Sequence, residues 1–413
     1  MMSKTAWLTL TAVAGLLVFG YIFTSKRVHE FRGDTPYYLA IAEQIASEPP
    51  RFRNPKSLWP NAPAMDRGPG WPFTLSLAIR LFPGGDRVFQ VKSTGAVIAL
   101  MNVLWIALLT FNLTRSNAFA LCAGLAWAAN PHTLALIEDG ATEPLFVFLT
   151  ALGLVAMHRG RGGVYGGAFF LGLSCLVRQF FVIFPFGLLA VCLLVHPWRH
   201  PRGPLWWRRL LIAGLLFLMP AAVWCYRNYK VCGRAPVLST LRGETFYGAN
   251  NPVVANQLET WGYWIMPDEI PGEVKKRRLS LTLTEAETDR YYFQKGLSHV
   301  RAHWFELPRH LLGKLIRGYV PIPWAPSWSS HAVFSYRWAL YIAFAITLNA
   351  ALQSCPQPYP KLLAAMWFTS VTVTLIFYGA ARFTYCFEPF LIPFIAKGVQ
   401  SMSTAAPSKP LVT

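Results

Sequence analysis

Charge is scarce in this sequence of 413 residues. Charged side chains make up 14% of it, against about 25% in soluble domains. Hydrophobic residues make up 54%, which is more than an ordinary globular core could bury. Acidic side chains are rarer than basic ones, with 19 aspartates and glutamates against 38 lysines and arginines. This composition excludes an ordinary soluble domain and indicates an integral membrane protein.

Cysteine and glycine patterns that mark common cofactor sites are also missing. The seven cysteines are scattered without a Cys-x-x-Cys pair, so neither a zinc site nor a disulfide framework is indicated. One pair near the outer loops, Cys225 with Cys232 or Cys386, stays open. The sequence has no Asp-x-Asp pair and no glycine-rich strand-turn-helix signature of a nucleotide-binding domain. The residues indicate no definite cofactor, and a divalent metal stays an open alternative.

Long apolar runs are abundant. A helix needs roughly 17 to 25 apolar residues to cross about 30 Å of hydrocarbon, and such runs predict an all-α polytopic membrane protein with about ten transmembrane helices. The first run follows Met-Met-Ser-Lys without a small-residue cleavage site, so we interpret it as an uncleaved span. The predicted spans are 7–23, 89–111, 118–137, 145–157, 164–177, 180–195, 210–224, 334–352, 362–379 and 387–396.

Basic residues in short connections predict the orientation. The runs 158–161 and 198–209 are rich in arginine and fall on the side of both termini, which is cytoplasmic by the positive-inside rule. Two long connections, about 24–87 and 226–333, then lie outside. The net charge of +19 reflects this topology and anionic lipid headgroups, so we expect no nucleic-acid partner.

Each outer loop contains a segment with helical periodicity. Residues 35–46 place Tyr38, Ile41, Ala42 and Ile45 on one face. Residues 297–315 repeat leucine and other apolar residues at three- and four-residue steps and bend near Pro308. Between those steps stand Arg301, Arg309, Lys314 and Arg317. Both segments are predicted to be amphipathic helices lying along the membrane surface.

Ionisable residues gather on the proposed outer side. Such residues are costly at a membrane and usually mark a functional cavity. Carboxylates together with arginines are what is needed to deprotonate an acceptor hydroxyl and to hold a departing phosphate. An inverting sugar transfer needs a single base, and arginine stabilises a phosphate leaving group without donating a proton. The set comprises Asp34, Asp66, Arg67, Glu138, Asp139, Glu143, Arg178, Arg227 and Arg382.

The order of these segments resembles the GT-C class of membrane glycosyltransferases, which contains the protein O-mannosyltransferases and the aminoarabinose transferase that modifies lipid A. The likeness covers nearly the whole chain. The matching pieces are Gly33-Asp34, the run 67–72, Glu143-Pro144, Leu176-Val177-Arg178, Arg227-Asn228-Tyr229, the run 248–252, Ala381-Arg382-Phe383 and Glu388-Pro389.

The resemblance implies a transfer of sugar from a polyprenyl-phosphate donor to a lipid, glycan or protein acceptor. It implies that Asp34 is the catalytic or acceptor-orienting acid and that Glu138 and Asp139 form a second carboxylate site. It also implies that Arg178 and Arg382 face the donor phosphate. The other expected substrate-binding residues are Arg67, Glu143, Arg227 and Asn251.

We expect residues 1–399 to form a single GT-C-like transmembrane catalytic domain, followed by a polar cytoplasmic tail at 400–413. The expected location is a bacterial inner membrane, among membrane lipids, with the active site facing the periplasm and serving the cell envelope.

Simpler interpretations stand beside these assignments. Asp34 and Glu143 could each only cap a helix, and Arg178 could extend to the lipid headgroups from a span end. His299 and His303 are four residues apart and could share a face as metal ligands, but no third ligand is evident. Candidates for sugar stacking are Trp261, Trp264, Trp324 and Trp328.

Two other functions compete with this interpretation. A lipid-linked oligosaccharide polymerase or ligase shares outer loops and polyprenyl substrates. A secondary transporter predicts charges near the bilayer midplane and paired repeats, whereas the charges here gather at one face.

Overall fold

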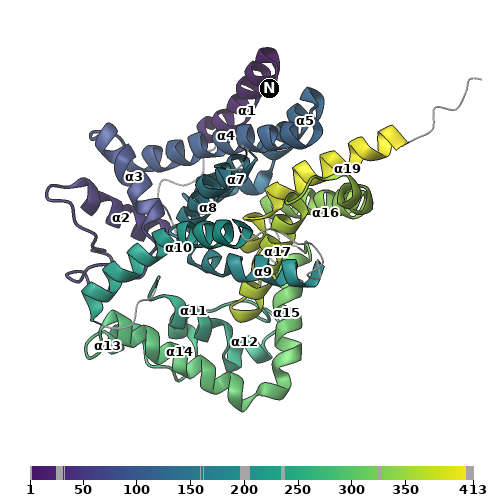
Figure 1. Ribbon diagram of the computed structural model, residues 1–413. Helices are drawn as coiled ribbons and strands as arrows, with labels where there is room; N and C mark the ends of the chain where they lie inside the picture. The colour runs from purple at the N-terminus through teal and green to yellow at the C-terminus, as the bar shows by residue number, and fades with distance from the viewer. Residues whose placement is uncertain are drawn as a thin grey trace, which may run out of the picture.

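Helices form the regular structure of this chain (Figure 1). A computed structural model describes residues 2–24, 31, 33–158, 160, 162–195, 205–233, 238–322 and 328–405. Within these ranges the only strand-like pairing is an isolated bridge between Arg53 and Pro63. The predicted all-α class is confirmed.

Helices cover the segments predicted to cross the membrane. Within the described residues, four are long and apolar enough to do so, and the bent pair α5–α6 would make a fifth. The chain is therefore an integral membrane protein, while the count of ten spans stays a prediction. The helices that cover the predicted spans are α1 (Lys4–Thr24), α4 (Arg87–Thr114), α5 (Asn117–Ala128), α6 (Pro131–Glu138), α7 (Glu143–Met157), α8 (Gly163–Ser174), α9 (Phe184–Val195), α10 (Leu205–Cys232), α16 (Trp328–Ser354), α17 (Tyr359–Ile376) and α19 (Leu391–Ala405).

Local sequence explains where the apolar segments break. Pro131 starts α6, where its missing N–H is not needed, and the Asn130 side chain caps this helix by accepting from the backbone N–H of His132 at 2.9 Å. The axes of α5 and α6 are bent by 45°. A second break follows α8, where the 3-10 helix η1 (Gln179–Ile183) leads into α9. The second break contains Arg178, a candidate site residue.

The two chain ends lie together at one end of the molecule. The backbone N–H of Ser3 donates to Asn117 Oδ1 at 3.2 Å, and Gln400 Nε2 donates to the carbonyl oxygen of Thr114 at 2.7 Å. Figure 1 places α1 at the top and α11–α15 at the bottom. This arrangement agrees with termini on one side and long connections on the other, but which side is cytoplasmic stays a prediction.

The first long connection contains α2 (Thr35–Ala46) and α3 (Gly70–Leu81). The apolar face of α2 is covered by the protein, because Ile41 and Ile45 are buried against Ala64. The amphipathic pattern of α2 therefore serves packing within the chain.

The second long connection is a helical region with its own small core around Tyr247, Ile270 and Tyr292. Its longest helix begins with a capping box, in which Thr284 and Glu287 bond each other's backbone N–H groups. The elements are α11 (Arg242–Ala249), α12 (Pro252–Asn256), η2 (Pro267–Glu269), α13 (Lys276–Leu279), α14 (Glu285–Ala302), η3 (Trp304–Glu306) and α15 (Leu307–Tyr319). The predicted bend near Pro308 is a break between α14 and α15, with Pro308 in the first turn of α15.

The buried face of α15 includes basic residues. Gly313, Lys314 and Arg317 are buried, whereas Leu312 is 53% exposed. Lys314 Nζ donates to Asn250 Oδ1 at 2.9 Å and to the carbonyl oxygen of Leu375 at 3.1 Å. Two of the basic residues that stand between the apolar steps, Lys314 and Arg317, therefore lie in polar contacts within the protein.

Three glycines form the junction between the second long connection and the membrane helices. The N–H of Gly379 donates to the carbonyl oxygen of Gly262 at 2.8 Å. A Cβ on Gly262 would overlap the backbone of Gly313, and one on Gly379 would overlap the carbonyl oxygen of Lys314. This glycine junction lets three backbone segments touch.

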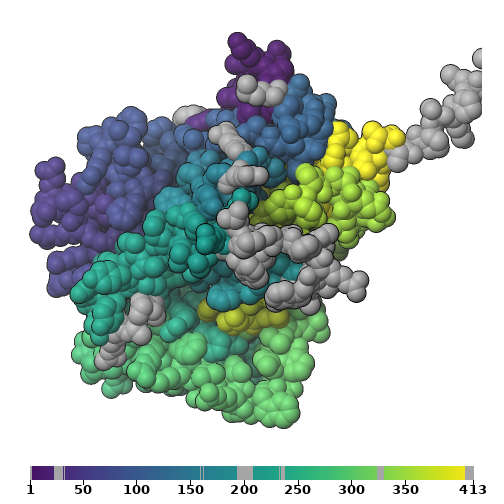
Figure 2. Space-filling view, viewed as in Figure 1, coloured from purple at the N-terminus to yellow at the C-terminus, as the bar shows by residue number. Residues whose placement is uncertain are grey.

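The two long connections contact each other. Trp59 Nε1 donates to the carbonyl oxygen of Leu283 at 3.0 Å, and Ser239 Oγ donates to that of Asp66 at 2.8 Å. In Figure 2 the green surface of α13–α15 forms the end of the molecule opposite α1. The connections therefore lie on the same side of the helical bundle.

Candidate active site

Asp34 stands at the N-cap position of α2, but its side chain does not cap the helix. Instead, Arg67 Nη2 donates to Asp34 Oδ1 at 2.9 Å. The Asp34 side chain is 45% exposed, whereas that of Arg67 is 8% exposed. The geometry therefore offers no support for the simple capping interpretation, and an accessible carboxylate is fixed by a buried arginine.

Aromatic rings and a second carboxylate hold Arg67. Its guanidinium carbon lies 5.2 Å from the ring centre of Tyr37 and 5.8 Å from that of Tyr38, distances at which a cation is attracted to a ring. Arg67 Nη1 is 3.7 Å from Asp66 Oδ2. These contacts leave Arg67 little freedom to release Asp34.

Three arginines set the charge of Asp34. Partial desolvation alone would raise the pKa of Asp34, but Arg67, Arg382 and Arg178 together hold it below its ordinary value. Asp34 is therefore ionised at neutral pH. Arg178 and Arg382 act on the Asp34 carboxylate through their charge, whereas Arg67 bonds it directly.

One buried carboxylate holds two of these arginines. Glu143, in the first turn of α7, is fully buried. Its Oε1 accepts a hydrogen bond from Arg178 Nη2 and another from Arg382 Nε, the latter at 2.8 Å. The Arg382 side chain is 37% exposed and that of Arg178 is 12% exposed. Glu143 thus joins the turn after α8 to α18 (Ala381–Tyr385).

Glycines bring the Arg67 turn against the Arg178 turn. The N–H of Gly70 donates to the carbonyl oxygen of Leu176 at 3.0 Å. A Cβ on Gly68 would lie 2.5 Å from that same oxygen, and one on Gly70 would lie 2.6 Å from a methyl group of Val177. Glycine at both positions allows this close approach.

Glu138 and Asp139 differ in their surroundings. Glu138 is buried, and Lys92 Nζ of α4 donates to its Oε2 at 2.7 Å. Asp139 is exposed, and its carbonyl oxygen accepts from Thr35 Oγ1 at 2.6 Å. Partial desolvation and the charge of Glu138 raise the pKa of Asp139 against the opposing charge of Arg382. The Asp139 backbone is therefore bonded to Thr35, the residue after Asp34, and its carboxyl feels the charge of Arg382, whereas Glu138 is directed to Lys92.

Arg227 and Asn251 belong to other networks. Arg227 Nη1 donates to the carbonyl oxygen of Ala64 at 2.7 Å, and its guanidinium carbon lies 4.8 Å from the ring centre of Trp224. Asn251 is fully buried, accepts from the backbone N–H groups of Val253 and Val254, and donates to two carbonyl oxygens. The residues that the structure brings together are Asp34, Arg67, Asp139, Glu143, Arg178 and Arg382.

Tyr378 also belongs to this cluster, because Arg382, Arg178 and Asp34 all act on it electrostatically. The sequence did not identify it. Its ring centre lies 4.9 Å from that of Phe383 and 6.3 Å from that of Trp264. Nothing in its apolar surroundings marks this tyrosine in the sequence. Trp264 thus lies near the cluster.

The other tryptophans suggested for sugar stacking are not seen near this cluster in the described part of the chain. A Cβ on Gly313 would lie 2.5 Å from the ring of Trp261, so that ring packs on α15. Trp324 and the side chain of Trp328 fall outside the described residues.

A second buried ion pair contacts α18. Arg337 Nε of α16 donates to Glu388 Oε1, in η4 (Glu388–Phe390), at 2.7 Å, and both side chains are 1% exposed. Arg337 Nη2 also donates to Thr384 Oγ1 at 2.8 Å. A charge inside the predicted span 334–352 was the available signal for Arg337, whereas Arg178 stands between the predicted spans 164–177 and 180–195.

Metal and disulfide geometry are not seen in the described part of the chain. No group of three or more histidine, cysteine or acidic side chains stands in metal-binding geometry there. Cys225 and Cys386 are both free, so they do not form the pair left open above. The side chain of Cys232 lies outside the described residues.

Comparison with family models and with curated proteins gave no match. Among solved structures, the chain resembles the oligosaccharyltransferase of Archaeoglobus fulgidus, crystallised tethered to an acceptor peptide with the NVT sequon, with a TM-score of 0.53 and 13% identity. That match covers 96% of this chain and 49% of the other, so this chain spans about half of its length. It also resembles ArnT of Cupriavidus metallidurans in the apo state, with a TM-score of 0.42, 14% identity, and coverage of 96% and 78%. The first likeness shows that this chain shares the fold of that oligosaccharyltransferase, in agreement with the fold that the sequence predicted.

Proposed function

We propose that this chain is a glycosyltransferase that moves a sugar from a polyprenyl-phosphate donor to an acceptor hydroxyl on the outer face of the membrane. One observation carries the proposal: an ionised, accessible Asp34 carboxylate lies among three arginines, two of which share the buried Glu143. A base beside a site for an anionic leaving group is what such a transfer needs.

Asp34 acts as the general base in this proposal. It takes the proton of the acceptor hydroxyl while that oxygen attacks the anomeric carbon. The bond between that carbon and the phosphate oxygen breaks, and the phosphate leaves with the bonding electrons. Attack from the face opposite the leaving group inverts the anomeric centre. Arg67 keeps the Asp34 carboxylate in place through its 2.9 Å hydrogen bond.

Arg382 and Arg178 stabilise the departing phosphate. Glu143 engages Nε of Arg382, which leaves the two terminal nitrogens of this 37% exposed side chain for the donor. Arg178 is less exposed and supports the site mainly through its charge. Glu143 is then a positioning residue, since a fully buried carboxylate does not touch substrate.

Asp139 is the second carboxylate in the proposal, and it orients the acceptor from the turn bonded to Thr35. Glu138 fixes the same turn through Lys92. Arg227 and Asn251 keep the surrounding loops in place, Arg227 by holding the segment at Ala64 and Asn251 by capping α12.

A lipid-borne donor follows from the location of the site. Nucleotide sugars are made in the cytoplasm, whereas we place this cluster on the periplasmic face of a bacterial inner membrane. The sequence also lacks a soluble nucleotide-binding signature. The acceptor is a lipid, a glycan or a protein.

The fold favours one alternative, a lipid-linked oligosaccharide ligase or polymerase, because the neighbour with the higher TM-score is an oligosaccharyltransferase. Offering a lipid-linked oligosaccharide beside a lipid-linked monosaccharide separates the two activities. The alternative predicts transfer of the oligosaccharide as a whole.

The test is a reconstituted assay in proteoliposomes with labelled polyprenyl-phosphate sugars or labelled nucleotide sugars, and envelope lipids and proteins as acceptors. We expect transfer only from the lipid-borne donors and loss of transfer in Asp34→Asn. The matched control is Asp86→Asn, because Asp86 caps α4 by accepting from the backbone N–H of Phe89. Transfer from nucleotide sugar alone, or near-normal turnover of Asp34→Asn, would overturn the proposal.

A further inference from the structure

Lys314 of α15 is a buried lysine that pairs with no carboxylate of the described residues. It is 1% exposed, and burial is the one cause that shifts its pKa, which falls to about 7. Taking an ammonium group out of water without a counter-charge is costly. Because an apolar side chain of similar length would avoid this cost, the lysine needs an explanation other than stability.

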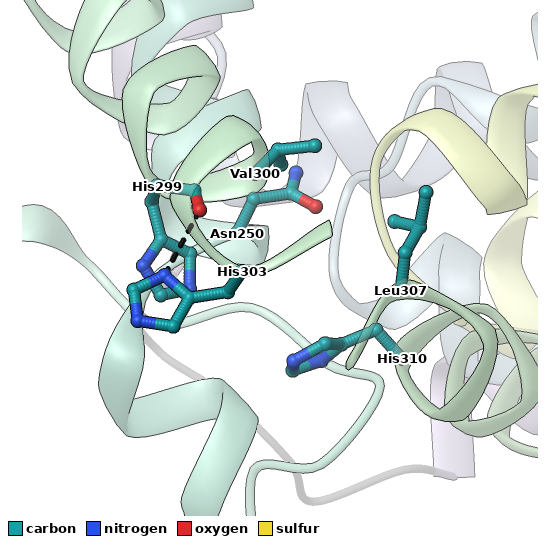
Figure 3. A pocket seen from close by; sticks show the side chains of 6 residues that line it. All are labelled: Asn250, His299, Val300, His303, Leu307 and His310. Carbon is teal, nitrogen blue, oxygen red and sulfur yellow. Dashed lines mark hydrogen bonds between the residues drawn. The ribbon is translucent and has the colours of Figure 1, made fainter. Parts of the chain in front are cut away.

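Three oxygen atoms hold the amine, which is the number that its three donors can bond. Lys314 Nζ donates to Asn250 Oδ1 at 2.9 Å and to the carbonyl oxygens of Leu375 and Ile376 at 3.1 and 3.5 Å. Asn250 follows α11 directly and lines the small pocket between α14 and α15 (Figure 3). Its Nδ2 donates to the same carbonyl oxygen of Ile376 at 3.4 Å. The amine thus joins α15 and the end of α11 to α17.

The two carbonyl oxygens belong to the last turn of α17. The last carbonyls of a helix have no partner within it, and a cation is favourable beside them because of the helix dipole. Many helices close this end with a residue in the left-handed conformation. No residue from Phe377 to Ala380 adopts that conformation here. Lys314 therefore caps α17 from a different element.

The chain continues from this helix end into the cluster around Asp34. Tyr378 stands two residues after the end of α17, and Arg382 lies in α18. Between them, the N–H of Gly379 donates to the carbonyl oxygen of Gly262 at 2.8 Å within the glycine junction. Segment 377–382 is thus fixed at its start by the Lys314 side chain and in its middle by the glycine junction.

We propose that Lys314 is a positioning residue for the transfer reaction, because its cap on α17 determines where Tyr378 and Arg382 stand in the cluster around Asp34. Lys314 is buried, so it acts through segment 377–382 and does not touch substrate. The proposed function supplies only the reaction and its donor. The mechanical part, that Lys314 fixes segment 377–382, does not depend on it.

The kinetic test is Lys314→Met, which keeps an unbranched side chain and removes the three donors. We expect kcat/KM for the polyprenyl-phosphate donor to fall about 10- to 100-fold, with a higher donor KM, because small displacements of site groups have effects of this size. The acceptor KM should stay unchanged, because Arg67 holds Asp34 from another segment. The Tm should change little, since removal of a buried charge offsets the lost hydrogen bonds.

Tyr319→Phe is the matched control. Tyr319 Oη of α15 donates to Ser370 Oγ of α17 at 2.6 Å, so this variant removes a hydrogen bond between the same two helices without touching the end of α17. It should keep the donor kcat/KM of the wild type. An equal loss in Tyr319→Phe and Lys314→Met would show a general weakening between α15 and α17 and contradict the positioning role, as would normal donor kinetics in Lys314→Met.

Hydrogen exchange measured by mass spectrometry tests the same idea without any substrate. The amide of Phe377 donates to Val373 and that of Gly379 to Gly262, so peptides covering 377–383 report local opening. We expect faster exchange there in Lys314→Met than in wild type and Tyr319→Phe, with residues 359–370 unchanged. Wild-type exchange of this segment in Lys314→Met overturns the proposal. Faster exchange in a chain whose wild type transfers no sugar would instead refute the proposed function alone.

Discussion

Arg382 is the more accessible of the two arginines on Glu143, so it tests the phosphate role most directly. Arg382→Ala should lower kcat by about 10²- to 10³-fold, the usual effect of removing one donor to a developing anion. Arg382→Lys should cause a smaller loss, because lysine keeps the charge but not the planar fork. Steady-state kinetics in proteoliposomes is the measurement, with Arg309→Lys of the exposed face of α15 as control. Equal activity of Arg382→Ala and wild type would remove Arg382 from the site.

Glu143→Gln tests the shared carboxylate. The amide leaves Arg178 and Arg382 without their common counter-charge, and breaking a buried pair by removing one partner costs about 3 to 5 kcal/mol. We expect a lower Tm and a loss of kcat at least as large as that of Arg382→Ala. Glu388→Gln, which breaks the buried pair with Arg337, should lower the Tm similarly with a smaller effect on kcat. An unchanged Tm in Glu143→Gln would show that the folded chain does not need the Glu143 charge to hold Arg178 and Arg382.

Glu285, at the start of α14, should make the stability of the folded chain depend on pH. Burial and the nearby Asp66 raise the pKa of Glu285 from 4.5 to about 7, although Thr240 Oγ1 donates a hydrogen bond to it. Between these values the folded chain holds a proton that the unfolded chain releases, so stability from this group falls as pH rises from 4.5 to 7. Glu285→Gln should therefore have a higher Tm than wild type at pH 8 and a similar Tm at pH 4.5. A Tm difference that does not change with pH contradicts this.

At the scale of helices, much was predictable because the signals are local. Apolar runs gave the helices, and Pro131 and Pro308 gave their boundaries. The partners of Glu143 could not be predicted, since Arg178 is 35 residues away and Arg382 is 239 residues away. The polar contact of Lys314 could not be predicted for the same reason, because its partner Asn250 lies 64 residues before it.

The glycine junction is testable by comparing two glycines with positive φ. Gly262 has φ +74° and would overlap Gly313 if it had a Cβ, whereas Gly272 has φ +78° with open space around it. Gly272→Ala should cost on the order of 1 to 3 kcal/mol of backbone strain, and Gly262→Ala should cost more. Chemical unfolding and limited proteolysis of residues 238–322 measure the difference. Equal effects would show that close packing at the junction adds nothing.

The whole molecule has its termini at one end and both long connections at the other. We expect Leu58→Cys and Leu281→Cys, both at exposed positions, to react with an impermeant thiol reagent from outside the cell. Met402→Cys near the C-terminus should react only after the membrane is permeabilised. The background is Cys122→Ser, because Cys122 is exposed. Labelling of position 58 only from the cytoplasmic side would invert the proposed topology.

Because one carboxylate serves two guanidiniums, the group formed by Glu143, Arg178 and Arg382 carries a single net positive charge. The phosphodiester of the proposed donor carries one negative charge and matches it. The spent lipid phosphate is a monoester with about 1.5 to 2 negative charges at pH 7, so we expect the cluster to hold the product more tightly than the donor. Departure of the lipid phosphate would then limit turnover, and accumulated lipid phosphate would inhibit the enzyme by occupying the place of the next donor.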